Sequence, residues 1–239
     1  MTDYAELFAD AIAEGELRRL GWGTISQTIE YDKKTKKPDS QKASATTAVI
    51  SSDIDKLSRK AVDSFDIVFA DGQDDDAARK ASESWTVDLI VNCELNKLRD
   101  GMYNKNSGLD HVMCAFMSER DIGYCVNVKN ILDTTGMRRA ILLGRINQNL
   151  MLCKKYKVRI VLSCGAKTPL DARTPQDLMN LGKILGLSVS QSRDAVSKNP
   201  MYFLSKAKDR NDPDIIMRGV RVKSWGGQKA EAKRRYGWY

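Results

Sequence analysis

The chain has 239 residues, a formal net charge of +8 and a hydrophobic content of 42%. This length can bury a substantial core, and we expect one α/β domain over residues 1–222, followed by a basic, aromatic tail over residues 223–239. No apolar run approaches the roughly 18 residues of a membrane span, and the first residues are acidic and amphipathic rather than a leader peptide. We therefore expect a soluble, cytoplasmic protein that does not bind a membrane.

Short apolar runs alternate with helical patterns along the chain. Strands are predicted over residues 25–31, 46–51, 66–70, 87–91, 124–128, 159–163 and 215–222. Helices are predicted over residues 53–61, 75–82, 109–120, 137–156, 175–185 and 190–197. Strands separated by helices indicate parallel crossovers, and seven or eight such units favour closure into a TIM-like (β/α) barrel.

Two segments outside these elements are strongly basic. Residues 33–42 are rich in lysine, contain Pro38 and lack periodicity, which is typical of a surface loop or hairpin. From Met217 to Tyr239 there are seven basic residues against one acidic residue, and from Ser224 onward the basic residues are mixed with aromatic side chains. This mixture suits stacking on exposed bases, and it is equally typical of a terminus that becomes ordered only on a partner.

The predicted helix at residues 137–156 has two unlike faces. One stripe contains Leu142, Leu143, Ile146, Leu150 and Cys153, which we expect to pack on the sheet. The basic and amide side chains of this helix are expected to lie largely outside that stripe. They are Arg138, Arg145, Gln148 and Asn149.

Residues 160–200 carry the most specific pattern in the chain. An apolar strand ends at Gly165, where the chain must turn, and Lys167 and Arg173 follow in the loop. Thr174 and Pro175 then provide an N-cap and a proline at the first helical position. The loop is therefore expected to hold two cations rigidly at the carboxyl end of a strand, where α/β folds usually place their function.

The excess of positive charge favours a polyanionic partner, because phosphate contacts dominate the affinity of such binding. A basic surface that is merely solvated is the alternative. The cysteines include no Cys-x-x-Cys pair, so buried free thiols are favoured over a disulfide or a metal site. They are Cys93, Cys114, Cys125, Cys153 and Cys164.

The sequence contains no convincing catalytic centre. The one histidine, His111, begins an amphipathic helix and is expected to be structural, whereas metal-dependent hydrolases on barrels assemble several histidines and carboxylates. Asp66, Asp71 and Asp88 lie at or near strand ends. Asp66 and Asp88 are expected to accept hydrogen bonds at strand starts, with a carboxylate-only Mg²⁺ site as the alternative. We therefore expect no catalytic and no metal-binding residues in this chain.

The order of residues in this C-terminal stretch resembles that of a known family. The pattern Ser163-x-Gly165-Ala166-Lys167-x-Pro169, then Leu170-x-x-Arg173-x-Pro175-x-Asp177-Leu178, is similar to protein component 3 of ribonuclease P. The similarity continues at residues 65–68, 79–81, 87–90, 107–112 and 138–140. One departure is the acidic turn at residues 71–76, where the family tends to carry a glycine-rich turn followed by an Asn-Arg pair.

The resemblance implies a single-domain TIM-like barrel related to that of the polymerase and histidinol phosphatases. It implies a noncatalytic subunit of the endoribonuclease ribonuclease P, whose RNA component removes 5′ leaders from precursor tRNA. Its partners would be the ribonuclease P RNA, protein component 2 and the other subunit proteins, with precursor tRNA contacted indirectly. The chain would bind no cofactor of its own, with Mg²⁺ on the RNA, and its length suits an archaeal member.

Cations that neutralise phosphates of a folded RNA would act by positioning rather than by chemistry. The residues expected to contact RNA are Lys167 and Arg173, then Arg138, Arg139 and Arg145, then Arg79 and Lys80. A surface salt bridge or a solvated cation is the alternative for each. Two other functions stay open: a metal-dependent phosphoesterase on the related barrel, and a protein-interaction scaffold without RNA contact.

Overall fold

Seven parallel strands form a nearly closed barrel in the computed structural model, which describes residues 3–32, 45–97, 100–102, 105–217 and 220–227. Each strand is hydrogen-bonded to the next in chain order. They are β1 (Ala5–Ala9), β2 (Thr24–Glu30), β3 (Ala45–Ile50), β4 (Ile67–Asp71), β5 (Leu89–Val91), β6 (Gly123–Asn127) and β7 (Ile160–Ser163).

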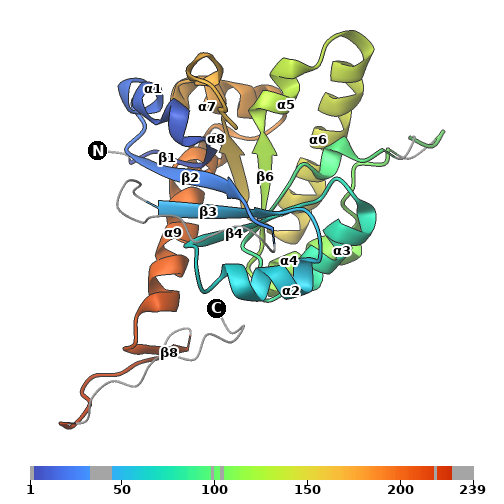
Figure 1. Ribbon diagram of the computed structural model, residues 1–239. Coiled ribbons are helices and arrows are strands. Elements are labelled where there is room, and N and C mark those ends of the chain that lie inside the picture. The colour runs from blue at the N-terminus through green and yellow to red at the C-terminus, as the bar shows by residue number, and fades with distance from the viewer. Residues whose placement is uncertain (1–2, 33–44, 98–99, 103–104, 218–219, 228–239) are drawn as a thin grey trace.

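Helices cover the outside of the barrel and one of its ends. The α-helices are α1 (Glu14–Arg19), α2 (Ile54–Ala61), α3 (Asp75–Glu83), α4 (His111–Glu119), α5 (Val128–Asp133), α6 (Gly136–Tyr156), α7 (Pro175–Ile184), α8 (Val189–Val196) and α9 (Lys198–Asn211). Short 3-10 helices are η1 (Ala11–Ala13), η2 (Cys93–Leu95) and η3 (Pro169–Asp171). The arrow of β6 points to the end of the barrel where α1, α5 and the loop before α7 lie, and α9 extends toward the opposite end (Figure 1).

The predicted barrel is confirmed, with two errors in the assignment of its strands. Six predicted strands and six predicted helices agree with the structure to within about two residues at each end. The first strand, β1, was not predicted, because the buried Glu6 makes that segment look like part of an amphipathic helix. The predicted strand at residues 215–222 is wrong, since β8 (Ile215–Met217) and β9 (Val220–Arg221) form a separate antiparallel pair.

Glu6 connects β1 to β7, the two strands at the ends of the hydrogen-bonded order. Its Oε2 accepts the backbone N–H of Cys164 at 2.9 Å, and its Oε1 accepts the N–H of Phe8 at 3.1 Å and the hydroxyl of Ser163. Burial raises the pKa of Glu6 above its ordinary value, although these hydrogen bonds act in the opposite direction. The Glu6 carboxyl group therefore helps to close the barrel, together with the N–H of Asp10, which is donated to the carbonyl of Ala166 at 2.8 Å.

We expect Glu6→Ala to lower the free energy of unfolding by about 2–3 kcal/mol, because it leaves buried donors on β7 without acceptors. The pKa of Glu6 is raised by folding, so the stability that its protonated form contributes is lost as the pH rises through that pKa. The advantage of the wild type over the variant should therefore shrink with rising pH in urea titrations. Glu16→Ala, in exposed α1, is the control, and an equal loss in both variants would contradict the account.

Helix α9 closes the amino-terminal end of the barrel and was not predicted from the sequence. Phe203, Leu204 and Ala207 pack in one apolar cluster with the barrel interior. Farther along α9, Lys206 and Arg210 form ion pairs with the buried Asp88 that precedes β5. The helix is therefore fixed by both apolar packing and buried charge.

The expected roles of the strand-start carboxylates are confirmed. Asp66 accepts the N–H and hydroxyl of Thr46 at 2.9 and 3.0 Å, and Asp88 accepts the N–H of Val68 at 3.1 Å. The predicted burial of all five cysteines as free thiols is also confirmed. Residues 33–42 and the tail from residue 228 lie outside the described residues.

The predicted faces of the helix now labelled α6 were partly wrong. Leu142, Ile146, Leu150 and Cys153 are buried as expected, but Arg145 and Asn149 are buried on the same side. Both make hydrogen bonds to the segment that follows β5. Within the described residues, no helix is long and apolar enough to cross a membrane.

Candidate functional site

The carboxyl ends of the strands surround a cavity of about 390 Å³, here called the mouth cavity. Its lining mixes both signs of charge with amide side chains. It includes Asp10, Thr28, Glu30, Asp71, Asn92, Asn127, Lys129, Asn130, Asp133, Gly165, Ala166 and Lys167. Burial raises the pKa of the Asp71 carboxyl, although hydrogen bonds from Asn92 and Gln73 partly offset this. The cavity can therefore accept a polar ligand that carries both hydroxyl groups and negative charge.

The loop from Gly165 to Thr174 forms one side of this mouth and is fixed at both ends. Thr168 and Asp171 form a capping box at η3, and Thr174 forms a second one with Asp177 at the start of α7. The predicted N-cap and first-turn proline of α7 are thereby confirmed. Two such boxes within a few residues restrict the backbone that carries the cations.

Side chains distant in sequence clamp the same loop. Lys129 Nζ lies 2.9 Å from Asp171 Oδ1, and this contact lowers the pKa of Asp171 to about 2. The indole N–H of Trp22 is donated to the carbonyl of Arg173 at 2.9 Å. The expectation of a rigidly held loop is therefore supported by contacts from α5 and from the segment before β2.

Lys167 and Arg173 both lie on this loop. Lys167 is exposed and its ammonium group has no partner among the described residues. Arg173 is half-buried and donates through Nη1 to the carbonyls of Leu170 and Ala172 at 2.9 and 2.7 Å. The ammonium group of Lys167 is thus available to bind an anion. The guanidinium of Arg173 is held in place by carbonyls of its own loop.

Arg138 and Arg139 lie in the first turn of α6, at the same end of the barrel (Figure 1). Arg138 is exposed and has no side-chain partner among the described residues. Arg139 donates to the carbonyls of Thr134 and Leu132 at 2.6 and 3.2 Å, which ties α6 to the end of α5. Four of the predicted RNA contacts therefore share one face, here called the mouth face.

Arg145 is 7% exposed and has a structural role that the sequence did not suggest. Its Nε and Nη2 lie 2.9 and 2.8 Å from Asp100 Oδ1, and its Nη1 donates to the carbonyls of Glu94 and Asn96 at 3.2 and 2.6 Å. Asp100 also accepts the N–H of Asn106 at 2.9 Å. The guanidinium therefore holds the segment between β5 and α4 against α6.

We expect Arg145→Ala to lower the free energy of unfolding by about 2–4 kcal/mol, since it removes several hydrogen bonds of a buried charged group. Amide hydrogens of residues 94–96 and 105–107 should exchange faster in the variant. Urea denaturation and hydrogen exchange measure these effects, with Arg138→Ala as an exposed control that should change stability by less than about 0.5 kcal/mol. Unchanged stability and exchange in Arg145→Ala would contradict the structural role.

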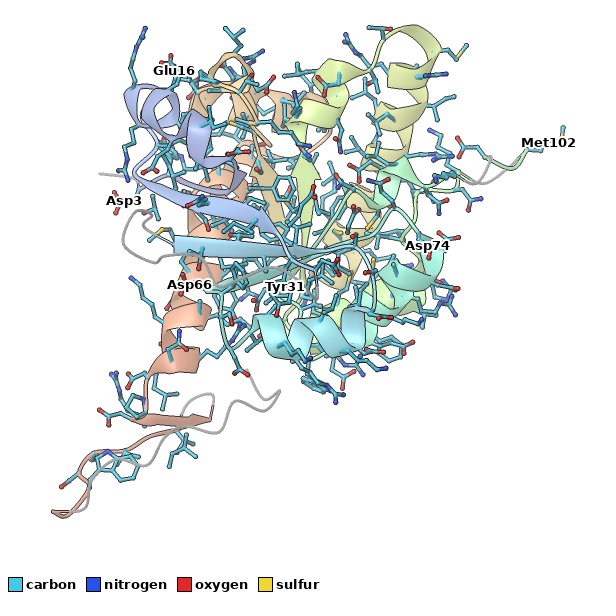
Figure 2. All side chains as sticks on the ribbon, viewed as in Figure 1. Asp3, Glu16, Tyr31, Asp66, Asp74 and Met102 are labelled. Atoms are coloured by element: carbon cyan, nitrogen blue, oxygen red, sulfur yellow. The ribbon has the colours of Figure 1, made fainter. Side chains whose placement is uncertain are left out.

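Arg79 and Lys80 lie on α3, at the side of the barrel. Arg79 is paired with Asp110 at 3.2 Å, with its side chain 64% exposed. Lys80 is exposed and shares a shallow cavity with four carboxylates at the N-terminal ends of α2 and α3, namely Asp53, Asp55, Asp74 and Asp76. Figure 2 shows Asp74 beside α3, away from Glu16 on α1 at the mouth face. These carboxylates reduce the positive potential around Lys80.

Three residues that shape the mouth face were not predicted from the sequence. Lys129 and Trp22 position the loop, and Arg19 adds an exposed cation on α1, paired with Glu16 at 3.5 Å. Helix α1 lies against η3. The basic end of α1 was visible in the sequence, but only the fold shows that it adjoins the loop.

Among the described residues, the polar lining of the mouth cavity consists of carboxylate, amide, hydroxyl and lysine side chains. Within the described part of the chain, no group of three or more histidine, cysteine, aspartate or glutamate residues could hold a metal ion. His111 is exposed at the start of α4, outside the mouth cavity. The arrangement is therefore suited to electrostatic and hydrogen-bonded recognition of a polyanion.

Comparison with protein families shows one match that covers most of the chain. Residues 15–212 match the model of the family described as RNase P subunit p30. The matched stretch includes β2 to β7, α1 in large part, and α2 to α9.

Individual relatives carry a consistent description. The chain is 29% identical over 159 residues to ribonuclease P protein component 3 of Methanosarcina barkeri, which covers 66% of this chain and 62% of that relative. It is 28% identical over 172 residues to the protein of the same name from Methanococcus vannielii, covering 71% and 70%. The chain thus spans less than two thirds of the length of the Methanosarcina relative.

Two solved structures share the fold. A chain in a cryo-EM structure of archaeal ribonuclease P with mature tRNA has a TM-score of 0.72 and 23% sequence identity, covering 94% of this chain and 100% of that one. A crystal structure of an uncharacterized protein has a TM-score of 0.56 and 7% identity, covering 86% and 75%. Both similarities show the barrel architecture.

Proposed function

Because the chain belongs to the RNase P subunit p30 family, we propose that it is a noncatalytic protein subunit of ribonuclease P. In this role it binds and stabilises the catalytic RNA, so that the holoenzyme removes 5′ leaders from precursor tRNA. The observation that carries the proposal is the family match over residues 15–212, and the cations of the mouth face supply a physical means of binding RNA.

The proposed RNA contacts divide by their surroundings. Lys167, Arg173, Arg138 and Arg139 are the leading candidates because they share the mouth face. Arg79 and Lys80 are proposed as weaker contacts, since carboxylates surround them. Arg145 is proposed to act indirectly, by holding the segment between β5 and α4. Cations of this kind favour a compact RNA because they reduce repulsion between its phosphates.

The proposed assembly contains more than one partner. The chain contacts the ribonuclease P RNA and other ribonuclease P proteins, among them protein component 2, and it meets precursor tRNA indirectly. Mg²⁺ is held by the RNA component, and the complex works in the cytoplasm. One chain of a solved archaeal ribonuclease P with mature tRNA has the same fold, and this supports ribonuclease P components as partners.

Salt dependence of RNA binding tests this proposal. Fluorescence anisotropy with labelled ribonuclease P RNA should give an affinity that falls steeply as KCl is raised, because cations of the protein release counterions from phosphates. If the protein makes several phosphate contacts, the logarithm of the binding constant plotted against the logarithm of the KCl concentration should have a slope well above one in magnitude. Affinity that is absent, or that is independent of salt, would favour a scaffold that contacts only proteins.

A further inference from the structure

Two consecutive backbone N–H groups beside the mouth cavity have no acceptor within the part of the chain that the structure describes. Three N–H groups in residues 164–168 are donated to side-chain oxygens at 2.9–3.2 Å. The donors are Cys164, Gly165 and Thr168, and the acceptors are Glu6, Ser163 and Asp171. For the N–H groups of Ala166 and Lys167, the described part of the chain provides no hydrogen-bond acceptor.

The N–H of Ala166 is the more unusual of the two. Ala166 is 0% exposed, and it lines the mouth cavity. Buried backbone N–H groups are nearly always paired, so an unpaired one in a residue that lines a cavity indicates a missing acceptor. Gly165, with φ of +64°, turns the chain immediately before it. Successive N–H groups that follow a left-handed residue form a concavity that binds anions.

Lys167 places a positive charge at the same position. Lys167 lines the mouth cavity, and its ammonium group has no partner among the described residues. Lys129, the other cation of the lining, is already paired with Asp171 and Asp133 at 2.9 and 3.4 Å. The ammonium group of Lys167 is therefore available to neutralise an anion that accepts hydrogen bonds from the two N–H groups.

Other parts of the cavity lining favour hydroxyl groups rather than a second anion. Glu30 and Asp71 line it with carboxylates, and the hydroxyl of Thr28 is buried there without a hydrogen-bond partner in the described structure. The hydrogen bonds that Asp71 accepts from Asn92 and Gln73 are long, at 3.3 Å. A ligand with a phosphate and neighbouring hydroxyls would satisfy both kinds of group.

We infer that the mouth cavity binds the phosphate and ribose of one ribonucleotide. The phosphate accepts hydrogen bonds from the N–H groups of Ala166 and Lys167 and pairs with the Lys167 ammonium. The ribose hydroxyls donate to the carboxylate of Asp71. A cavity of about 390 Å³ is in the range of small-ligand sites. That the ribonucleotide belongs to an RNA strand rests on the proposed function; a free ribonucleotide presents the same chemistry.

Amide chemical shifts of the whole protein test this inference directly. In ¹H–¹⁵N spectra, uridine 5′-monophosphate should shift the amides of Ala166 and Lys167 in a saturable manner. The 2′-deoxy nucleotide and inorganic phosphate should bind more weakly, because they lack one or both ribose hydroxyls. Lys167→Met, which keeps the length of the side chain, should weaken nucleotide binding by about tenfold or more. Lys183→Met, at an exposed lysine of α7, is the matched control and should bind as the wild type does.

The source of the ribonucleotide is tested by competition. A short single-stranded RNA that displaces uridine 5′-monophosphate from these amides would support the inference for an RNA strand. Saturable nucleotide binding without any binding of ribonuclease P RNA would support the site and contradict the proposed function. Salt-dependent binding of that RNA with no shift at Ala166 and Lys167 would overturn the inference and leave the proposed function standing.

Discussion

Asp88→Ala is expected to lower the free energy of unfolding by about 3–5 kcal/mol, the largest stability effect of any variant considered. The carboxylate is buried, and it pairs with Arg210 and with Lys206, whose Nζ lies 3.1 Å from Oδ1. Its removal takes a buried counter-ion away from two buried cations of α9. It also removes the acceptor of the N–H of Val68 at the start of β4.

The pH dependence of this effect follows from the pKa of Asp88. Burial alone would raise it, but Arg210 and Lys206 outweigh burial, and the pKa lies below its ordinary value. Burial lowers the pKa of Lys206 in spite of Asp88, so Arg210 is the dominant partner. Because folding depresses the pKa of Asp88, its contribution is present above the unfolded pKa of about 3.9 and is lost as the pH falls through the folded value.

Asp66→Ala provides the matched control, since Asp66 occupies the same position before β4 and, among the described residues, accepts hydrogen bonds only from neutral groups of Thr46. We expect it to cost about 1–2 kcal/mol. Urea titrations between pH 3 and pH 7 should show the difference between wild type and Asp88→Ala narrowing toward acid. A loss no greater than that of Asp66→Ala would show that the buried ion pairs do not fix α9.

The double variant Lys167→Ala with Arg173→Ala is expected to reduce cleavage of precursor tRNA by the reconstituted enzyme about tenfold or more at low magnesium. Two phosphate contacts would be lost, and the slope of log K against log salt should fall by up to about two for RNA binding. High magnesium should restore most of the activity, because the ions then take over the neutralisation of phosphates. Initial rates across a magnesium titration measure this effect.

Arg59→Ala with Lys60→Ala is the control of equal charge, because both residues are exposed in the last turn of α2. It should leave cleavage within about twofold of the wild type, since the only interactions lost are long-range ones between exposed charges, which salt largely screens. Thermal unfolding of both double variants separates lost RNA contacts from lost folding, given that Arg173 also bonds to its own loop. Unchanged cleavage by the Lys167 and Arg173 variant at low magnesium would exclude these two residues as RNA contacts.

Patterns local in sequence predicted most of the barrel. The strands β3 to β7 are buried almost throughout and most of them are apolar runs, and the start of α7 was evident from Thr174 and Pro175. Parallel strands that are buried on both faces have continuous apolar runs in their sequence, so such runs predict their positions. The alternation of these strands with helices then predicted the closed architecture.

Buried charge explains what the sequence could not predict. Glu6 in β1, Arg145 in α6 and Arg210 in α9 are charged residues on faces that burial would normally make apolar. Each is satisfied by a partner that is remote in sequence, namely the loop after β7, Asp100 and Asp88. A single sequence does not reveal these pairs, so β1 and α9 were missed and Arg145 was assigned to the wrong face.

The candidate site was predicted in outline only. Lys167 and Arg173 were expected in a rigid loop at the carboxyl end of a strand, and the structure holds them there. The clamps from Trp22 and Lys129 depend on how distant segments meet, which no local pattern encodes. The unpaired N–H of Ala166 is likewise a property of the folded backbone.

The most direct measurement of the central claim is precursor-tRNA cleavage by the cognate ribonuclease P RNA at limiting magnesium, with protein component 2 present and this chain added or omitted. The isolated chain, supplied with divalent metal and phosphoester substrates, is measured beside it. We predict that the chain stimulates cleavage in the mixture and does not turn over substrate alone. Turnover by the isolated chain, without stimulation of the RNA, would instead indicate a phosphoesterase and contradict the account.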